Sequence, residues 1–310
     1  MTSRHKRLEQ PKHFQLTTRD IDVLNSVYQH RFLTSAHIHT LHFAPSSLRV
    51  AQVRLKYMWG AGLLDRLYLP PEMPAVRDRY TEQPLYNLSG RGAMHLSDKI
   101  GIPISEIPHT PRQNWHGFTR LRHNLVFTDM AVAFQAFVKW HPDWNAETTR
   151  EEKMAPLVPQ WHDRKGAILP DGAITLKHIG FAMPQTLLFE VVRAGARSGN
   201  KTIGRKMRRY CAALKSGFFR EIYGFDWVRN VIFLTPTIAR AKNLAALARD
   251  IPGGERLFRF GAYETRDNNL VAPKTLLTAD RLTEPELLTP SGGCVSFIPT
   301  FSNTSKPSHV

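Results

Sequence analysis

The chain has few cysteines, no long hydrophobic run and comparatively few acidic residues. Its two cysteines, Cys211 and Cys294, lie far apart among 310 residues, so we expect no disulfide framework and a reducing, cytoplasmic location. No run of about 18 apolar residues occurs, and the first residues lack the apolar segment of a secretory signal. We therefore expect no membrane partner.

Motifs of several enzyme classes are also missing. The sequence has no P-loop, no GxGxxG after a strand, no CxxC pair and no hydrolase elbow around a serine. His37, His39 and His42 lack zinc-site spacing, and we expect them on a helix surface. What is present is a globular composition, with 42% hydrophobic residues, in a chain long enough for two domains.

The shortage of acids leaves a strong positive charge. Lys and Arg number 42 against 26 Asp and Glu, a formal net charge of +16. Residues 111–250 hold 22 Lys and Arg against 11 acids, whereas residues 251–310 hold six of each. This concentration in the middle of the chain, without a basic amphipathic helix suited to a membrane, indicates double-stranded DNA as the partner.

The N-terminal part predicts a small DNA-binding domain. Residues 1–14 read as a flexible basic arm, and residues 15–102 as three helices followed by two strands, the order of a winged helix-turn-helix. Thr17 and Asp20 mark the start of the first helix. We expect side chains on the third helix and the wing to contact DNA: Arg49, Gln52, Arg54, Lys56, Arg77 and Arg79. A solvated polar face, or a domain that contacts protein, is the alternative.

A second domain is expected after a proline-rich linker at residues 103–116. Residues 117–272 predict the order helix, three strands, helix, strand, helix, strand, which is that of the restriction-endonuclease-like, or PD-(D/E)XK, fold. The overall fold class is thus α/β (α+β). The Pro-, Ser- and Thr-rich residues 273–310 predict a disordered tail.

Two acids in this second domain suggest nuclease chemistry. Asp171 and Glu190 lie on adjacent expected strands, where carboxylates can hold Mg²⁺. Strand alternation places Val192 where such nucleases carry a lysine. Lys206 on the following helix, with Lys201 behind it, is the candidate replacement. Glu147 or Asp129 is a candidate third acid. The alternative is that Asp171 lies in an ordinary turn and that Glu190 only pairs with an arginine.

The same region carries a long basic run. Seven cations occur within seventeen residues without an acid: Arg193, Arg197, Lys201, Arg205, Lys206, Arg208 and Arg209. Gly195, Gly199 and Gly204 would permit close approach of a phosphate backbone. If about four of these cations contact DNA, binding would fall with salt at a log–log slope near −4. A solvated helix face is the alternative.

The segments "LTTRDIDVLNSVYQHRFLTSAHIHTLHF", "YNLSGRGAMHL", "PDGAI", "LFEVVRAG" and "KMRRY" occur in an order that resembles replication-relaxation family proteins. The resemblance covers about residues 15–262. It implies DNA handling in plasmids and other mobile elements. The family strand resembles Glu-x-Asp followed by Arg, whereas this chain has Val192 at the Asp position, which lowers the expectation of metal binding.

Together these features predict a DNA-binding protein of replication initiation, relaxation or mobilisation, whose nuclease-like domain is non-catalytic. The alternatives are an Mg²⁺-dependent nickase using Asp171, Glu190 and Lys206, and a winged-helix transcriptional regulator. Binding to other replication or mobilisation proteins and formation of a homodimer are left open.

Overall fold

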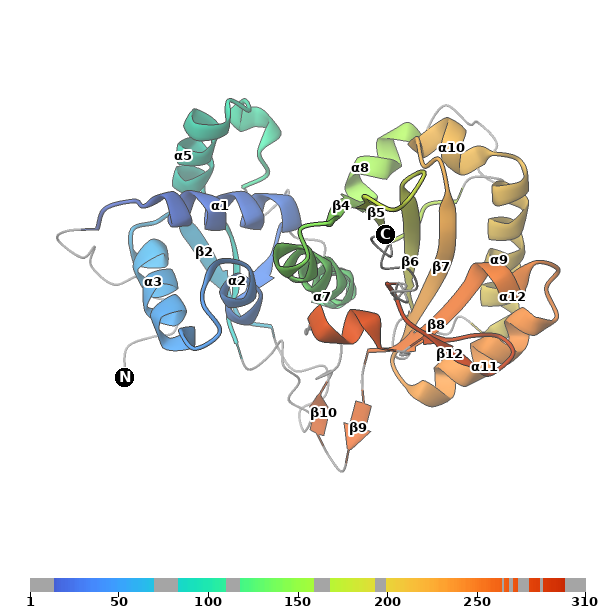
Figure 1. Ribbon diagram of the computed structural model, residues 1–310. Coiled ribbons are helices and arrows are strands. Elements are labelled where there is room, and N and C mark those ends of the chain that lie inside the picture. Colours follow the sequence, from blue (N-terminus) through green and yellow to red (C-terminus); the bar gives the residue numbers. More distant parts are fainter. Residues whose placement is uncertain are drawn as a thin grey trace, which may run out of the picture. The chain divides into compact units, whose positions relative to one another are not determined.

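The computed structural model describes residues 14–69, 83–109, 118–158, 168–192, 199–263, 265–267, 270–272, 279–284 and 287–298. These residues combine helices with sheets, which confirms the predicted α/β class (Figure 1). They divide into unit 1, Met1–Val132 with Arg266–Pro273, and unit 2, Ala133–Thr265 with Lys274–Val310. Within the described ranges, no helix combines the length and apolarity needed to cross a membrane.

Unit 1 consists of helices around a small antiparallel sheet of order β1-β3-β2. Its elements in chain order are α1 (Thr18–His30), β1 (Leu33–Thr34), α2 (Ser35–His42), α3 (Leu48–Gly60), β2 (Leu64–Leu67), β3 (Leu85–Leu88), α5 (Gly90–Ile100) and η1 (Ile104–Glu106). The three predicted helices and two predicted strands are therefore present. The two-residue strand β1, which pairs with β3, is an addition that the sequence pattern did not indicate.

Local sequence explains where the helices of unit 1 begin. Thr17 caps α1, since its side chain accepts from the Asp20 amide while the Asp20 carboxylate accepts from the Thr17 amide. The hydroxyl oxygens of Thr34 and Ser89 cap α2 and α5 by accepting from the His37 and Gly92 amides. The inner faces of these helices then bury a shared core that includes Leu24, Leu55 and Leu96.

The boundary between the units falls inside α7 (Phe118–Trp140), at Val132, rather than in the predicted linker. Leu121, Leu125 and Val132 on the first part of this helix belong to the hydrophobic clusters of unit 1. Part of the predicted linker is also built into unit 1, because η1 leads to the fully buried Ile107. Residues 110–117 lie outside the described ranges.

Unit 2 is built on a seven-stranded sheet of order β12-β11-β8-β7-β6-β5-β4. The strands are β4 (Trp144–Arg150), β5 (Gly172–His178), β6 (Gln185–Val191), β7 (Val228–Thr235), β8 (Phe258–Ala262), β11 (Leu287–Leu288) and β12 (Cys294–Val295). β4, β5 and β6 pair antiparallel, whereas β6, β7 and β8 pair parallel. The remaining elements within the described residues are α8 (Glu151–Met154), η2 (Ala155–Leu157), α9 (Asn200–Lys215), α10 (Phe218–Tyr223), α11 (Ile238–Arg249), α12 (Gly254–Leu257), β9 (Thr265–Asp267), β10 (Leu270–Ala272) and η3 (Ala279–Thr283).

Helices cover both faces of this sheet (Figure 1). Because side chains alternate along a strand, β6 sends Phe189 to one face, where its ring meets that of Phe134 on α7 at 6.5 Å. Leu188 and Glu190 point to the other face, where α9 and α11 pack. Burial on both faces explains why β6 is buried along its whole length.

Within the segment expected to be a disordered tail from residue 273, residues 279–284 and 287–298 include regular structure. β11 pairs with β8 through Leu288 and Phe260, and β12 pairs with β11. Phe297 packs its ring 6.2 Å from that of Phe134. The Pro, Ser and Thr content of the segment masked these few apolar side chains, whose burial against the sheet supplies the driving force for ordering.

Candidate nucleic-acid interface

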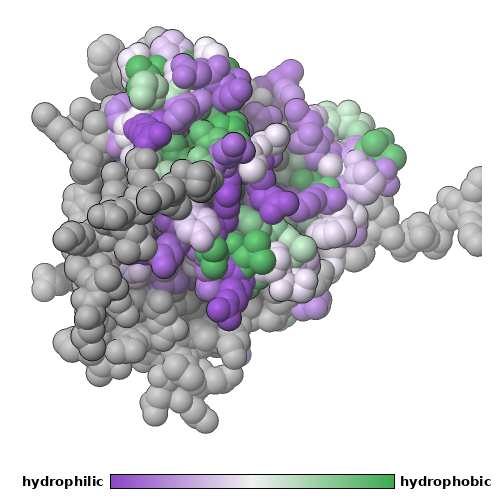
Figure 2. All heavy atoms as spheres, turned by 90° about the vertical axis from the view of Figure 1, so that its left-hand side faces the viewer, coloured by the Kyte–Doolittle hydropathy of each residue, from purple (hydrophilic) through white to green (hydrophobic). Residues whose placement is uncertain are grey.

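Helix α3 presents a basic face to solvent. It buries Ala51, Leu55 and Met58, so that Arg49, Gln52 and Lys56 are exposed, as the helical period requires. No Asp or Glu occurs within α3. Figure 2 shows the side of the molecule on which α3 lies in Figure 1, where hydrophilic and apolar side chains alternate over a short distance. The other two predicted contacts of this domain, Arg77 and Arg79, lie outside the described residues.

Arg54, also predicted to contact DNA, is occupied within unit 1. Its Nε donates to Asp20 Oδ1 at 2.8 Å, its Nη2 contacts Asp20 Oδ2, and Nη2 also donates to the Gln15 carbonyl at 2.7 Å. The Phe14 ring lies 4.5 Å from the guanidinium. Asp20 is buried, yet hydrogen bonds from Arg54 and Thr17 outweigh the effect of burial and lower its pKa. Arg54 thus ties α3 to the start of α1.

Helix α9 presents a second basic face. Lys201, Arg205 and Arg208 are exposed, whereas Ile203, Met207 and Tyr210 are buried in the core of unit 2. Arg209 is half-buried. Arg193 and Arg197 lie outside the described residues, so the structure places only the part of the predicted basic run that belongs to α9.

Gly204 has a different role from the one expected. It is buried, and a Cβ built there would lie 3.3 Å from the Leu247 side chain of α11. This glycine therefore allows α9 and α11 to pack closely and does not face a phosphate.

Glu190, Lys206 and Tyr210 meet at the carboxyl end of β6. The Lys206 ammonium donates to Glu190 Oε2, and the Tyr210 hydroxyl donates to Glu190 Oε1. Asp171 lies nearby, because its Oδ2 accepts from the Val191 amide at 2.7 Å. The three residues predicted from sequence as one group, Asp171, Glu190 and Lys206, are thus brought together. Tyr210 is the member that the sequence analysis missed.

Burial sets the protonation of this group. It raises the pKa of Glu190 to about 7, in spite of the opposing charge of Lys206, and the charge of Asp171 acts in the same direction as burial. Burial also opposes the charged form of Lys206, but Glu190 and Asp171 outweigh it and raise the pKa of the lysine. The result is a buried carboxyl that titrates near neutrality beside a permanent cation.

An Mg²⁺ ion at this place would have to share Glu190 with two side chains. Mg²⁺ takes oxygen ligands in nearly octahedral order, and each oxygen of the buried Glu190 carboxylate already accepts from Lys206 or Tyr210. Across the described residues, no three His, Cys, Asp or Glu side chains gather closely enough to hold a metal ion.

The two candidate additional acids lie elsewhere. Asp129 accepts from His37 Nε2 at 2.6 Å inside unit 1, where both side chains are buried. His37 Nδ1 accepts from the Thr34 amide, which leaves Nε2 to carry the proton. The expectation that His37 lies on a helix surface is therefore wrong. Glu147 is exposed on β4 and lies 3.8 Å from Lys177.

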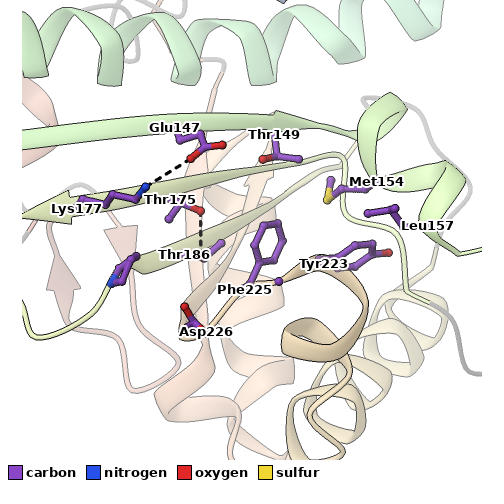
Figure 3. Close-up of a pocket in the computed structure, with 12 residues that line it drawn as sticks. Glu147, Thr149, Met154, Leu157, Thr175, Lys177, Thr186, Tyr223, Phe225 and Asp226 are labelled. Atoms are coloured by element: carbon purple, nitrogen blue, oxygen red, sulfur yellow. Dashed lines mark hydrogen bonds and ion pairs between the residues drawn. The ribbon is translucent and has the colours of Figure 1, made fainter.

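Glu147 also lines a pocket of about 250 Å³ (Figure 3). The pocket floor contains Thr175 and Thr186, whose hydroxyl oxygens are 3.0 Å apart. Tyr223, at the end of α10, and Phe225, just after it, line another part of the pocket, and Met154 and Leu157 close the side. Its residues come from strands and helices far apart in sequence, so no local motif could reveal it.

The fold and these surfaces place the molecule in a general class, that of strongly basic, two-unit α/β proteins with solvent-facing basic helix surfaces on both units. The sequence profile of the replication-relaxation family matches residues 24–226, which is more than half of the chain. The chain therefore belongs to the replication-relaxation family. No curated protein and no solved structure matches it.

Proposed function

We propose that this protein binds double-stranded DNA and acts in the replication, relaxation or mobilisation of a plasmid or other mobile element. The observation that carries the proposal is that α3 and α9, neither of which contains an acid, each expose several cations on the side opposite a buried apolar face. Cationic helix faces without acids suit phosphate contacts and base contacts in a groove. Membership of the replication-relaxation family supplies the cellular context.

The order of elements supports a role for each unit. In unit 1, three helices followed by the β2–β3 pair fit a winged helix-turn-helix whose third helix, α3, enters the major groove. In unit 2, a helix, three antiparallel strands, a helix and a parallel strand fit the core of a restriction-endonuclease-like domain. On this proposal unit 2 holds the phosphate backbone through α9.

We further propose that unit 2 does not cleave DNA. Each Glu190 oxygen accepts from a side chain of α9, so a metal ion would have to compete with Lys206 and Tyr210 for this carboxylate. Val192 occupies the position at which such nucleases carry a lysine. In its place Lys206, from the neighbouring helix α9, pairs with the buried Glu190 carboxylate. Glu190 then serves to anchor α9 to the sheet.

Binding is tested by fluorescence anisotropy with a random-sequence duplex over a range of salt concentrations. Changing Lys201, Arg205 and Arg208 together to Gln should weaken binding and reduce the log–log salt slope by about three, since each lost phosphate contact removes about 0.9. The matched control changes Lys99, Lys153 and Arg256, which are exposed residues outside α3 and α9, to Gln. Equal losses in both triple variants would show only a general charge effect and would contradict the assignment to α9.

Cleavage is tested with supercoiled plasmid and Mg²⁺. We expect no nicking by the wild-type protein. The gathering of Asp171, Glu190 and Lys206 is the observation that favours the opposite outcome. Nicking that disappears in both Asp171→Ala and Glu190→Ala would establish a nickase and overturn the non-catalytic assignment.

A further inference from the structure

Helix α3 exposes apolar side chains that the fold of unit 1 does not use. Val50 is 57% exposed, Val53 is 43% exposed and Tyr57 is 42% exposed. Their spacing of three and four residues places them on one side of the helix, as a stripe beside the one formed by Arg49, Gln52 and Lys56. Valine is also a mediocre helix former, so local helix propensity does not account for it at exposed positions.

We propose that Val50, Val53 and Tyr57 form an apolar stripe that contacts the C5-methyl groups of thymine in the major groove. This inference rests on the proposed binding of duplex DNA by α3 and specifies the base that it reads. In the major groove, the thymine methyl is the apolar group that the bases present, whereas the other edges offer hydrogen-bond donors and acceptors. A helix that reads A·T pairs there therefore needs apolar side chains next to polar ones.

The neighbouring charges favour DNA over a second copy of the chain as the occupant. Arg49 and Lys56 lie along one side of the apolar stripe, and α3 contains no acid to neutralise them. A two-fold contact through the apolar stripe would bring these cations close to their own copies, and like charges across an interface oppose association. Phosphates on either side of a groove instead attract them. The side chains of the apolar stripe then meet the floor of the groove.

The test begins with selection of the duplexes that the wild-type protein binds from a random-sequence pool. Each selected duplex is then synthesised in two forms, one with thymine and one with uracil, which lacks the C5-methyl group, and the affinities of the two forms are compared. We expect tighter binding of the thymine form by about fourfold for each methyl group contacted. Val50→Ala and Val53→Ala should bring the ratio of the two affinities closer to one. They should leave the salt slope unchanged, since neither removes a charge.

Met94→Ala is the matched control, because Met94 is an exposed apolar residue of unit 1 on α5. It should keep the wild-type preference for thymine. Equal affinity for the two forms, with salt-dependent binding intact, would overturn the inference and leave the proposed function standing. Failure to bind either pool would overturn both. A dimer in sedimentation that dissociates in Val53→Ala, with no thymine preference, would show that the apolar stripe joins two copies and would also overturn the inference.

Discussion

The buried carboxyl of Glu190 should make the stability of unit 2 depend on pH. Its pKa is about 7 in the folded protein against an ordinary value of 4.5. A raised pKa means that folding favours the protonated form. The contribution of Glu190 to stability is therefore complete below about pH 4.5, and it is lost as the pH rises through about 7. The full shift corresponds to about 3 kcal/mol.

The perturbation is Glu190→Gln, which keeps the size of the side chain and an oxygen for the Tyr210 hydroxyl but removes the titration. Between about pH 5 and about pH 8, the wild-type protein should lose about 2 kcal/mol through this group, and the variant should lack that loss. The assay is urea unfolding at both pH values, followed by tryptophan fluorescence. The difference between the two pH values is compared across proteins, so any constant cost of the substitution cancels.

Glu147→Gln is the control, since it removes an exposed carboxylate from the same sheet. It should retain the pH dependence of the wild-type protein. The reasoning would be refuted if Glu190→Gln showed the same loss of stability between the two pH values as the wild-type protein, because Glu190 would then ionise in the folded and unfolded chains at the same pH.

Two further predictions concern unit 1. Arg54→Ala leaves the buried Asp20 without its cation and should lower the free energy of unfolding by about 3 kcal/mol. Arg49→Ala, the control, should change it by less than about 0.5 kcal/mol. Equal free energies of unfolding for the two variants in urea would contradict the structural role of Arg54. Gly92→Ala places a Cβ 1.9 Å from the Leu63 carbonyl oxygen, whereas the nearest atom at Gly90 is 3.7 Å away. Gly92→Ala should therefore cost about 3 kcal/mol. Gly90→Ala should be neutral or stabilise by up to about 1 kcal/mol, because alanine is the better helix former. Thermal unfolding of the two variants in parallel would show no loss of stability in Gly92→Ala if the backbone could move aside.

Much of the element order follows from the sequence because it depends on local patterns. The apolar spacing of α3 and of α7, the Thr17 cap and the buried run of β6 each report on residues within one or two turns or one strand. The basic faces of α3 and α9 follow from the same periodicity. These features were sufficient to predict the α/β class and to point to the family.

The partners of individual side chains could not be predicted in this way. In the sequence, Arg54 cannot be told apart from the exposed cations Arg49 and Lys56 of the same helix. Only the packing of α3 on α1 brings Arg54 to Asp20, 34 residues earlier in the chain. The same holds for Asp129, which a helix in another part of unit 1 engages through His37. A charge pattern along one helix cannot show which cations the fold has already used.

The sequence by itself thus determined the basic character, most of the helices and strands, and Asp171, Glu190 and Lys206 as one candidate group. The tertiary structure decided that β6 and α9 bring Glu190, Lys206 and Tyr210 into contact, and that residues 287–298 complete the sheet. The physical reason is that periodicity acts over a few residues, whereas the protonation and bonding of a buried carboxyl depend on every element packed against it.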